Sequence, residues 1–216
     1  MKKKKILIVS DAWEPQINGV VTTLKGLIKT LRERGHRVEV IEPGMFKTMR
    51  MPLYPEIRLA LNIWKVKDMI HGYAPDYIHI ATEGPLGIYA RNFCEKHGYP
   101  YTTSYHTNYQ EFISAFTKLP AKWFYPFMRW MHKHAKSILV TTESMRRHLE
   151  SHGFENLVVW NRAVDTELYD PKKNTGIFEE YEKPIWINVG RVSPEKNISA
   201  FLDLPLEGTK VIVGDG

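Results

Sequence analysis

The sequence predicts a doubly wound α/β fold, in which a parallel sheet carries helices on both faces. Short apolar runs rich in β-branched and aromatic residues alternate with helix-length segments, a pattern typical of parallel sheets. The runs lie at residues 6–9, 38–41, 77–80, 101–104, 138–140 and 157–160. An incomplete second α/β lobe is expected after them, because a further apolar run at residues 185–189 follows a charged, turn-rich stretch.

The first helix is the clearest of the predicted elements. Its apolar residues recur with a period of 3.6, and Gly35 stands where a helix C-cap commonly lies. They are Val20, Val21, Leu24, Leu27, Ile28 and Leu31. Residues 45–55 are rich in Met, Lys and Pro without periodicity, which predicts a loop before a helix near residues 63–71.

The pattern divides the chain into three segments. Residues 1–170 are predicted to form one complete lobe, and residues 171–183 a linker. Residues 184–216 are predicted to begin a second lobe with a strand, a helix and a strand. An activity that needs two lobes is therefore not expected of this chain alone.

Composition excludes several classes of protein. No apolar run approaches the roughly 18 residues of a membrane-spanning helix, and a single cysteine, Cys94, excludes an intrachain disulfide. The net charge is +6, of which four lysines at residues 2–5 supply a large part, so nucleic-acid binding is not expected. The basic start lacks a cleavage site and predicts a first strand rather than a signal peptide, which favours a cytoplasmic location.

Ligands of parallel α/β sheets bind beyond the carboxyl ends of the strands, so the residues after each strand are the candidates. Asp11 and Trp13 follow the first strand, and Asn18 and Gly19 lead into the first helix. Free amides at a helix N-terminus beside a glycine form an anion site. A plain Asn-Gly turn explains the same residues equally well. The GxGxxG fingerprint is absent, which argues against a nicotinamide dehydrogenase.

A second phosphate-site pattern occurs at residues 189–197, VGRVSPEKN. Ser193 suits a helix N-cap, Pro194 the first helical position, and Lys196 the first turn. A cation in a first turn opposes the helix dipole unless an anion lies nearby. Arg191 at the strand end adds a second cation, so a bound diphosphate would satisfy both; the alternative is a solvated lysine or one paired with Glu195.

The loop after the run at residues 101–104 carries Tyr105, His106, Thr107 and Asn108. A histidine at a strand end can hydrogen-bond a sugar hydroxyl or stabilise developing charge, although a lone histidine is more often structural. Glu83, in the sequence ATEGPLG, follows another strand and either holds acceptor hydroxyls or belongs to a tight turn.

Metal binding is not expected. His132 and His134 are two residues apart and so point in different directions on a helix. An Asp-x-Asp pair, which would chelate the ion of a nucleotide diphosphate, is also absent.

Residues 121–136 contain four cations and no acidic residue. A helical wheel places Phe124, Phe127, Met128 and Met131 on one face, with Lys122, Arg129, Lys133 and Lys136 opposite and Trp123 and Trp130 on the flank. An ordinary helix packed on the sheet explains this pattern. The functional interpretation is that the basic face meets anionic lipid headgroups.

Six motifs in order carry a resemblance to a known family: DAWEPQINGVVTTL, ATEGPLG, SYHTNYQEF, VTTESM, VWNRAVDTELYDP and VGRVSPEKN. They resemble the retaining nucleotide-sugar glycosyltransferases of family 4, in particular α-mannosyltransferase-like and glycolipid-forming members. The resemblance covers residues 5–216. It implies the GT-B architecture, with a Rossmann-like N-terminal lobe that holds the acceptor and a C-terminal lobe that holds the nucleotide sugar.

The resemblance also implies roles for individual residues. The Gly19 amide would contact the donor diphosphate, Arg191 and Lys196 would neutralise the leaving group, and His106 would contact the transferred sugar. Arg162 and Asp165 match a motif near the cleft between the lobes, where the family commonly has glycine in place of Ala163. Neither a metal nor another cofactor is implied, and the family's pair of donor-binding glutamates lies beyond residue 216.

Two classes of function remain open. The chain is either the acceptor lobe of a transferase that moves a mannose- or glucose-type hexose to a lipid or saccharide, or a non-catalytic sugar- or lipid-binding module. Arg191 and Lys196 favour the first, because a pure acceptor-binding module does not need cations for a leaving group. A peripheral location on the inner face of the membrane fits a lipid acceptor.

Overall fold

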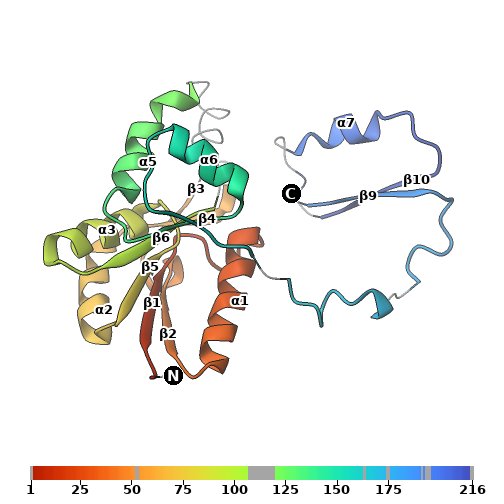
Figure 1. The fold of residues 1–216 in the computed structure, drawn as a ribbon. Coiled ribbons are helices and arrows are strands. Elements are labelled where there is room, and N and C mark those ends of the chain that lie inside the picture. Colours follow the sequence, from red (N-terminus) through yellow and green to blue (C-terminus); the bar gives the residue numbers. More distant parts are fainter. Residues whose placement is uncertain are drawn as a thin grey trace. The chain divides into compact units, whose positions relative to one another are not determined.

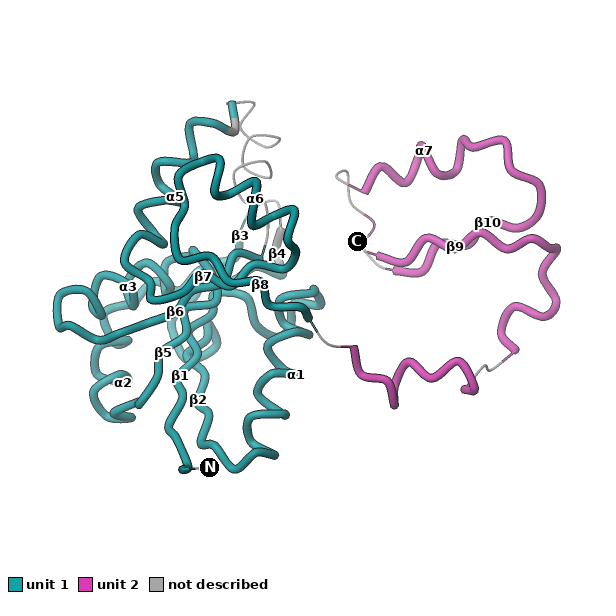
Figure 2. Tube along the Cα trace, in the orientation of Figure 1, with its two compact units in different colours: residues 1–163 teal, residues 164–216 magenta. Residues whose placement is uncertain are grey.

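The computed structural model describes residues 2–51, 54–106, 120–162, 164–173, 176–190, 192 and 196–214. The chain forms two compact units, Met1–Ala163 and Val164–Gly216 (Figure 2). The assignment of an acceptor lobe to residues 1–170, a linker to 171–183 and a donor lobe to 184–216 concerns function and stays a prediction.

A six-stranded sheet forms the centre of the first unit (Figure 1). Its order is β2 (Arg37–Ile41), β1 (Lys5–Val9), β5 (Tyr77–Ile80), β6 (Tyr101–Tyr105), β7 (Ile138–Val140) and β8 (Leu157–Val159). All neighbouring strands pair in parallel, which confirms the predicted fold class. The carboxyl ends of all six strands therefore meet at one edge of the sheet.

Helices cover both faces of this sheet. Successive strand residues point to opposite sides, so Ile8 packs with Leu24 and Ile28 of α1 (Gly19–Glu33). Leu7 and Val9 face the larger core on the other side, which α2 (Val66–Tyr73), α3 (Pro85–His97), α5 (Tyr125–His132) and α6 (Glu143–Ser151) help to build. Short 3-10 turns lie at Pro43–Met45, Ile63–Lys65, Ala121–Trp123 and Pro171–Lys173.

The prediction of a loop at residues 45–55 is wrong in part. β3 (Thr48–Met51) pairs with β4 (Tyr54–Ala60) as an antiparallel hairpin. Met49 in β3 is half exposed, whereas Ala60 at the end of β4 is buried. Backbone pairing, rather than an alternating apolar face, holds this hairpin together, which is why the pattern of side chains did not reveal it.

The second unit has the expected strand, helix and strand. β9 (Ile185–Val189) pairs in parallel with β10 (Thr209–Val213), and α7 (Ile198–Leu202) connects them. Lys196 has 3-10 geometry and precedes α7, whose N-cap is Asn197 in a left-handed conformation (φ 47°), so it does not belong to the first turn of α7 itself. Ser193 and Pro194 lie outside the described residues.

Candidate functional site

Three residues from distant parts of the first unit meet beyond the carboxyl ends of its strands. Gly19 begins α1, His106 directly follows β6, and Arg162 follows β8. Arg162 Nη2 lies 3.0 Å from His106 Nδ1, and a methyl group added to Gly19 would lie 3.5 Å from Arg162 Nη1. We call Gly19, His106 and Arg162 the strand-end site.

The N-terminus of α1 is shaped by Asn18. Its Oδ1 accepts hydrogen bonds from the amides of Val20 and Val21, both at 3.0 Å, and its Nδ2 donates to Gln16. The cap thus satisfies two of the first amides, whereas the Gly19 amide belongs to those for which a helix has no acceptor of its own. A guanidinium beside this N-terminus is opposed by the helix dipole, by roughly 0.3–1 kcal/mol, unless an anion joins them.

His106 is neutral at physiological pH. Burial, followed by the nearby charge of Arg162 and by His79, lowers the pKa of its imidazole to about 3. Its Nε2 atom is shielded from solvent and has no hydrogen-bond partner among the described residues. The indole ring of Trp160, two residues before Arg162, lies 6.4 Å from the imidazole ring.

A second buried histidine, His79, was not singled out in the sequence. It lies in β5 opposite Thr102 of β6, and its ring nitrogens contact the Thr102 hydroxyl at 2.8 Å and the Ser104 hydroxyl at 2.9 Å. Burial lowers the pKa of His79 to about 4. Polar residues at alternate positions of an otherwise buried strand were the signal for this network.

The Asp11 side chain is bound by hydrogen bonds within the protein and is not open to a ligand. Its carboxylate accepts hydrogen bonds from the amides of Leu86 (2.8 Å) and Gly87 (3.1 Å) at the start of α3 and from the Thr82 hydroxyl (2.9 Å). A side chain at Gly84 would overlap the Asp11 carboxylate. Asp11 thus fills the anion site of α3 and ties the end of β1 to it.

Glu83 and Trp13, which were also predicted to line the cleft, are partly buried in the first unit. The Glu83 carboxylate points to buried His132, with Oε1 and Nε2 3.5 Å apart, and Trp13 packs half-buried against the core around α1. Tyr105 is 1% exposed and its side chain belongs to the core, and its predicted place at the cleft stays a prediction.

The remaining predicted residues lie in the second unit or outside the described residues. Asp165 and Lys196 belong to the second unit, where Asp165 accepts hydrogen bonds from the amides of Glu167 and Leu168. Thr107, Asn108 and Arg191 lie outside the described residues. Their predicted roles stay predictions.

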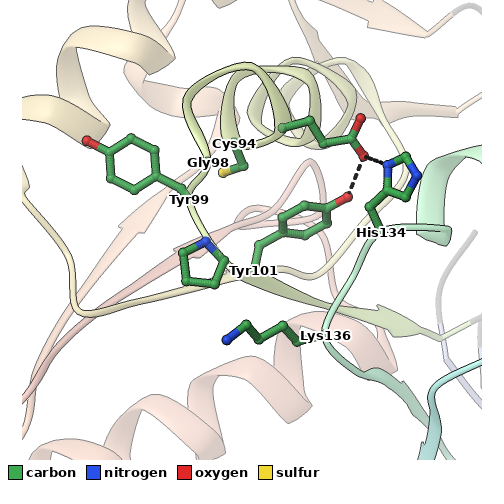
Figure 3. A pocket seen from close by; sticks show the side chains of 8 residues that line it. Cys94, Gly98, Tyr99, Tyr101, His134 and Lys136 are labelled. Carbon is green, nitrogen blue, oxygen red and sulfur yellow. Dashed lines mark hydrogen bonds and ion pairs between the residues drawn. The ribbon is translucent and has the colours of Figure 1, made fainter.

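A hollow of about 580 Å³ lies elsewhere, at the amino ends of β6 and β7 (Figure 3). Its lining includes Tyr101, the first residue of β6, and Lys136, just before β7. Glu95 Oε1 accepts a hydrogen bond from the Tyr101 hydroxyl at 2.8 Å and lies 3.0 Å from His134 Nδ1. Because ligands of parallel sheets bind at the opposite edge, we do not assign this hollow to the strand-end site.

The helix α5 presents an aromatic and basic face to solvent. Trp123, Phe127 and Trp130 are 61%, 37% and 39% exposed, and Lys122, Arg129 and Lys133 are exposed among them. The buried residues are Tyr125, Met128, Met131 and His132, so the prediction that Phe127 shares the buried face is wrong. We call these six exposed residues the aromatic-basic face.

The described residues lack two kinds of feature. They contain no cluster of three or more His, Cys, Asp or Glu residues placed to hold a metal ion. Among their helices, none combines the length and the apolarity that crossing a membrane requires.

These features define a doubly wound α/β domain with a guanidinium beside a helix N-terminus at the carboxyl ends of its strands. Comparison with protein families then identifies it: residues 17–168 match the model of Glycosyltransferase Family 4, so the chain belongs to this family. A crystal structure of a glycosyltransferase from Rickettsia africae shares the fold, with a TM-score of 0.66 at 18% identity over all of this chain and 61% of that one.

Curated relatives include enzymes of three kinds. A GDP-mannose-dependent alpha-mannosyltransferase of Mycobacterium tuberculosis is 25% identical over 98% of this chain and 63% of its own length. An alpha-monoglucosyldiacylglycerol synthase of Streptococcus pneumoniae is 25% identical over 98% of this chain and 56% of its own. Sulfoquinovosyl transferase SQD2 of Arabidopsis thaliana is 26% identical over 93% of this chain and 44% of its own length. The chain thus spans less than two thirds of these relatives.

Proposed function

We propose that the chain is the acceptor-side part of a retaining glycosyltransferase that moves a mannose- or glucose-type hexose from a nucleotide-diphosphate sugar to a lipid or saccharide. The observation that carries this is the strand-end site, where the Arg162 guanidinium lies beside Gly19 and the neutral imidazole of His106. A diphosphate would supply an anion for this cation and this helix N-terminus. The mannosyl and glucosyl specificities of the relatives support the sugar class.

In this proposal the bond between the anomeric carbon and the diphosphate breaks as the acceptor hydroxyl attacks. The hydroxyl proton passes to the departing diphosphate on the same face of the sugar, so no side-chain base is needed. The protein's main contribution is then electrostatic: the Gly19 amide, Arg191 and Lys196 stabilise the charge of the leaving group. No metal or other cofactor takes part.

The activity is tested by a transfer assay with radiolabelled nucleotide sugars and a diacylglycerol acceptor. The chain alone is expected to give neither transfer nor donor binding by calorimetry, because nucleobase and ribose need a second lobe that also excludes water. A protein that carries both lobes should transfer sugar, and His106→Ala should reduce its turnover by roughly 10². Near-normal turnover of that variant would make His106 structural.

The alternative is a non-catalytic sugar- or lipid-binding module. It predicts that the acceptor binds with the same affinity whether or not the second lobe is present, and that no transfer occurs in either case. Turnover by the chain alone would contradict both hypotheses and would indicate that the donor site is divided differently.

We also propose that the aromatic-basic face binds an anionic membrane surface, which would place the protein at the cytoplasmic face of the membrane. Trp and Phe side chains suit the headgroup boundary, and each basic residue near an anionic surface contributes roughly 1 kcal/mol. A lipid acceptor, as the names of relatives suggest, would be reached from this position.

Vesicle co-sedimentation tests this binding. Reversal of Lys122, Arg129 and Lys133 to Glu should weaken binding to phosphatidylglycerol vesicles by at least about tenfold, and added salt should weaken the unmodified protein. The same charge change at exposed Lys29, Arg34 and Lys67 is the matched control. Equal loss in both variants would indicate a general charge effect, and no binding of the unmodified protein at low salt would end the membrane proposal.

A further inference from the structure

We propose that Arg162 is a positioning residue that fixes His106 as the tautomer with its proton on Nε2, so that His106 offers the transferred sugar a hydrogen-bond donor. The role toward the sugar rests on the proposed function. The tautomer rests only on contacts within the first unit.

The contact between the two side chains determines where the proton lies. Arg162 Nη2 is 3.0 Å from His106 Nδ1 and 3.5 Å from the His106 carbonyl oxygen. A guanidinium has only N–H donors and no acceptor, so Nδ1 must accept with its lone pair. A neutral imidazole has one proton, which must then be on Nε2.

The surroundings of His106 disfavour a doubly protonated ring. Arg162, from the loop after β8, places a positive charge against Nδ1, and His79, from β5, also disfavours a second proton on the ring. Burial acts in the same direction and, with these two groups, brings the pKa of His106 to about 3. The ring therefore stays neutral from pH 5 to pH 8.

The other ring nitrogen, Nε2, indicates what His106 can do. Nε2–H is shielded from solvent and has no acceptor among the described residues, and an unpaired buried donor is unfavourable unless an acceptor is supplied. A sugar hydroxyl or ring oxygen is such an acceptor. Because the lone pair of Nδ1 is already bound to Arg162, His106 acts as a neutral donor and not as a general base.

Nitrogen NMR of histidine-labelled protein tests the tautomer on this chain. At pH 7 the His106 ring, assigned by its loss in His106→Gln, should show the Nε2–H form. Arg162→Met removes the donors and should give a mixture of tautomers and protonation at higher pH, whereas Arg34→Met, at the exposed end of α1, should change nothing. An Nδ1–H form in the unmodified chain, or an unchanged His106 signal in Arg162→Met, would overturn the inference.

A folding defect in Arg162→Met would appear in the signals of the other histidines. In that case Arg162→Lys provides the test, because its ammonium keeps the charge and a single donor. It should preserve the Nε2–H form, and loss of that form in a folded Arg162→Lys chain would count against the inference.

Transfer by a protein with both lobes tests the role toward the sugar. The side-chain amide of Gln places an N–H near the position of histidine Nε2, and that of Asn near Nδ1. His106→Gln should therefore retain about tenfold more turnover than His106→Asn, with little pH dependence between pH 6 and pH 8. The reverse order would refute the donor role. Absence of transfer by the unmodified protein would refute the proposed function, while the NMR result would stand.

Discussion

Asp11 provides the sharpest test of how the strand-end edge is built. Its carboxylate is held by two α3 amides and the Thr82 hydroxyl, which favour the charged form, whereas burial disfavours it. Burial outweighs the hydrogen bonds and raises the pKa of Asp11 from 3.8 to about 6. A carboxyl whose pKa is raised on folding makes a contribution to stability that is lost as pH rises through the folded pKa.

The change in stability with pH depends on the pKa of Asp11 in the folded protein and in the unfolded chain. Between pH 7 and pH 5 the folded protein takes up most of one proton at Asp11 and the unfolded chain almost none, which corresponds to a gain of about 1 kcal/mol. Asp11→Asn keeps the shape without titrating. The stability of the unmodified chain relative to Asp11→Asn should therefore rise by about 1 kcal/mol on going from pH 7 to pH 5.

Urea unfolding of both proteins at the two pH values measures this difference directly. Asp68→Asn, at an exposed position in the first turn of α2, controls for the general loss of a carboxylate near a helix N-terminus. A difference between the unmodified chain and Asp11→Asn that is constant, or that falls toward pH 5, would refute the reasoning. It would mean that the hydrogen bonds from α3 outweigh burial.

Further predictions concern the helices α1 and α3, and urea unfolding checks each of them. Gly87→Ala should destabilise the chain by about 3 kcal/mol or more, because its methyl group would overlap the Thr82 carbonyl oxygen. Gly26→Ala, in the exposed part of α1 with open space around it, should stabilise the chain by about 0.5–1 kcal/mol. If Gly26→Ala and Gly87→Ala changed the stability equally, the overlap at Gly87 would be contradicted. Asn18→Ala should cost about 1 kcal/mol through loss of the α1 cap, and no cost would show that water replaces it.

Much of the sheet was predictable from local sequence. The six strands match the apolar runs closely, because a strand buried on both faces needs apolar residues throughout. The hairpin of β3 and β4 was not predictable in this way. Its residues are largely half exposed where the structure describes them, so they carry no alternation that marks a buried face.

The face of α5 was predicted with the wrong rotation. The helical wheel assumed a regular helix from residue 121, whereas Ala121–Trp123 is a 3-10 turn and α5 begins at Tyr125. A 3-10 turn has about three residues per turn, so it changes where Lys122 and Trp123 lie relative to the faces of α5. Phe127 lies within α5 at the edge of the face that buries Met128 and Met131, and it is exposed next to Trp130, with 5.8 Å between the ring centroids.

The sequence identified individual candidate residues but not which of them contact one another. The position of His106 after a strand made it a candidate, because parallel strands end at one edge, and the family resemblance then gave it a role. The contact with Arg162 joins residues 56 positions apart, and it depends on how the loops after β6 and β8 leave the sheet. Local pattern contains no information on that geometry.

Two helices begin at or just after a glycine in the sequence, Gly19 and Gly84, and the sequence pattern does not distinguish them. The structure does, because their N-termini have different neighbours. The N-terminus of α3 is already occupied by a carboxylate from the same chain, since Asp11 accepts from its first amides. The N-terminus of α1 has the opposite neighbour, the Arg162 guanidinium. An external anion would be repelled by Asp11 at α3 and attracted by Arg162 at α1. Of these two helix starts, α1 is therefore the one that we propose as the diphosphate site.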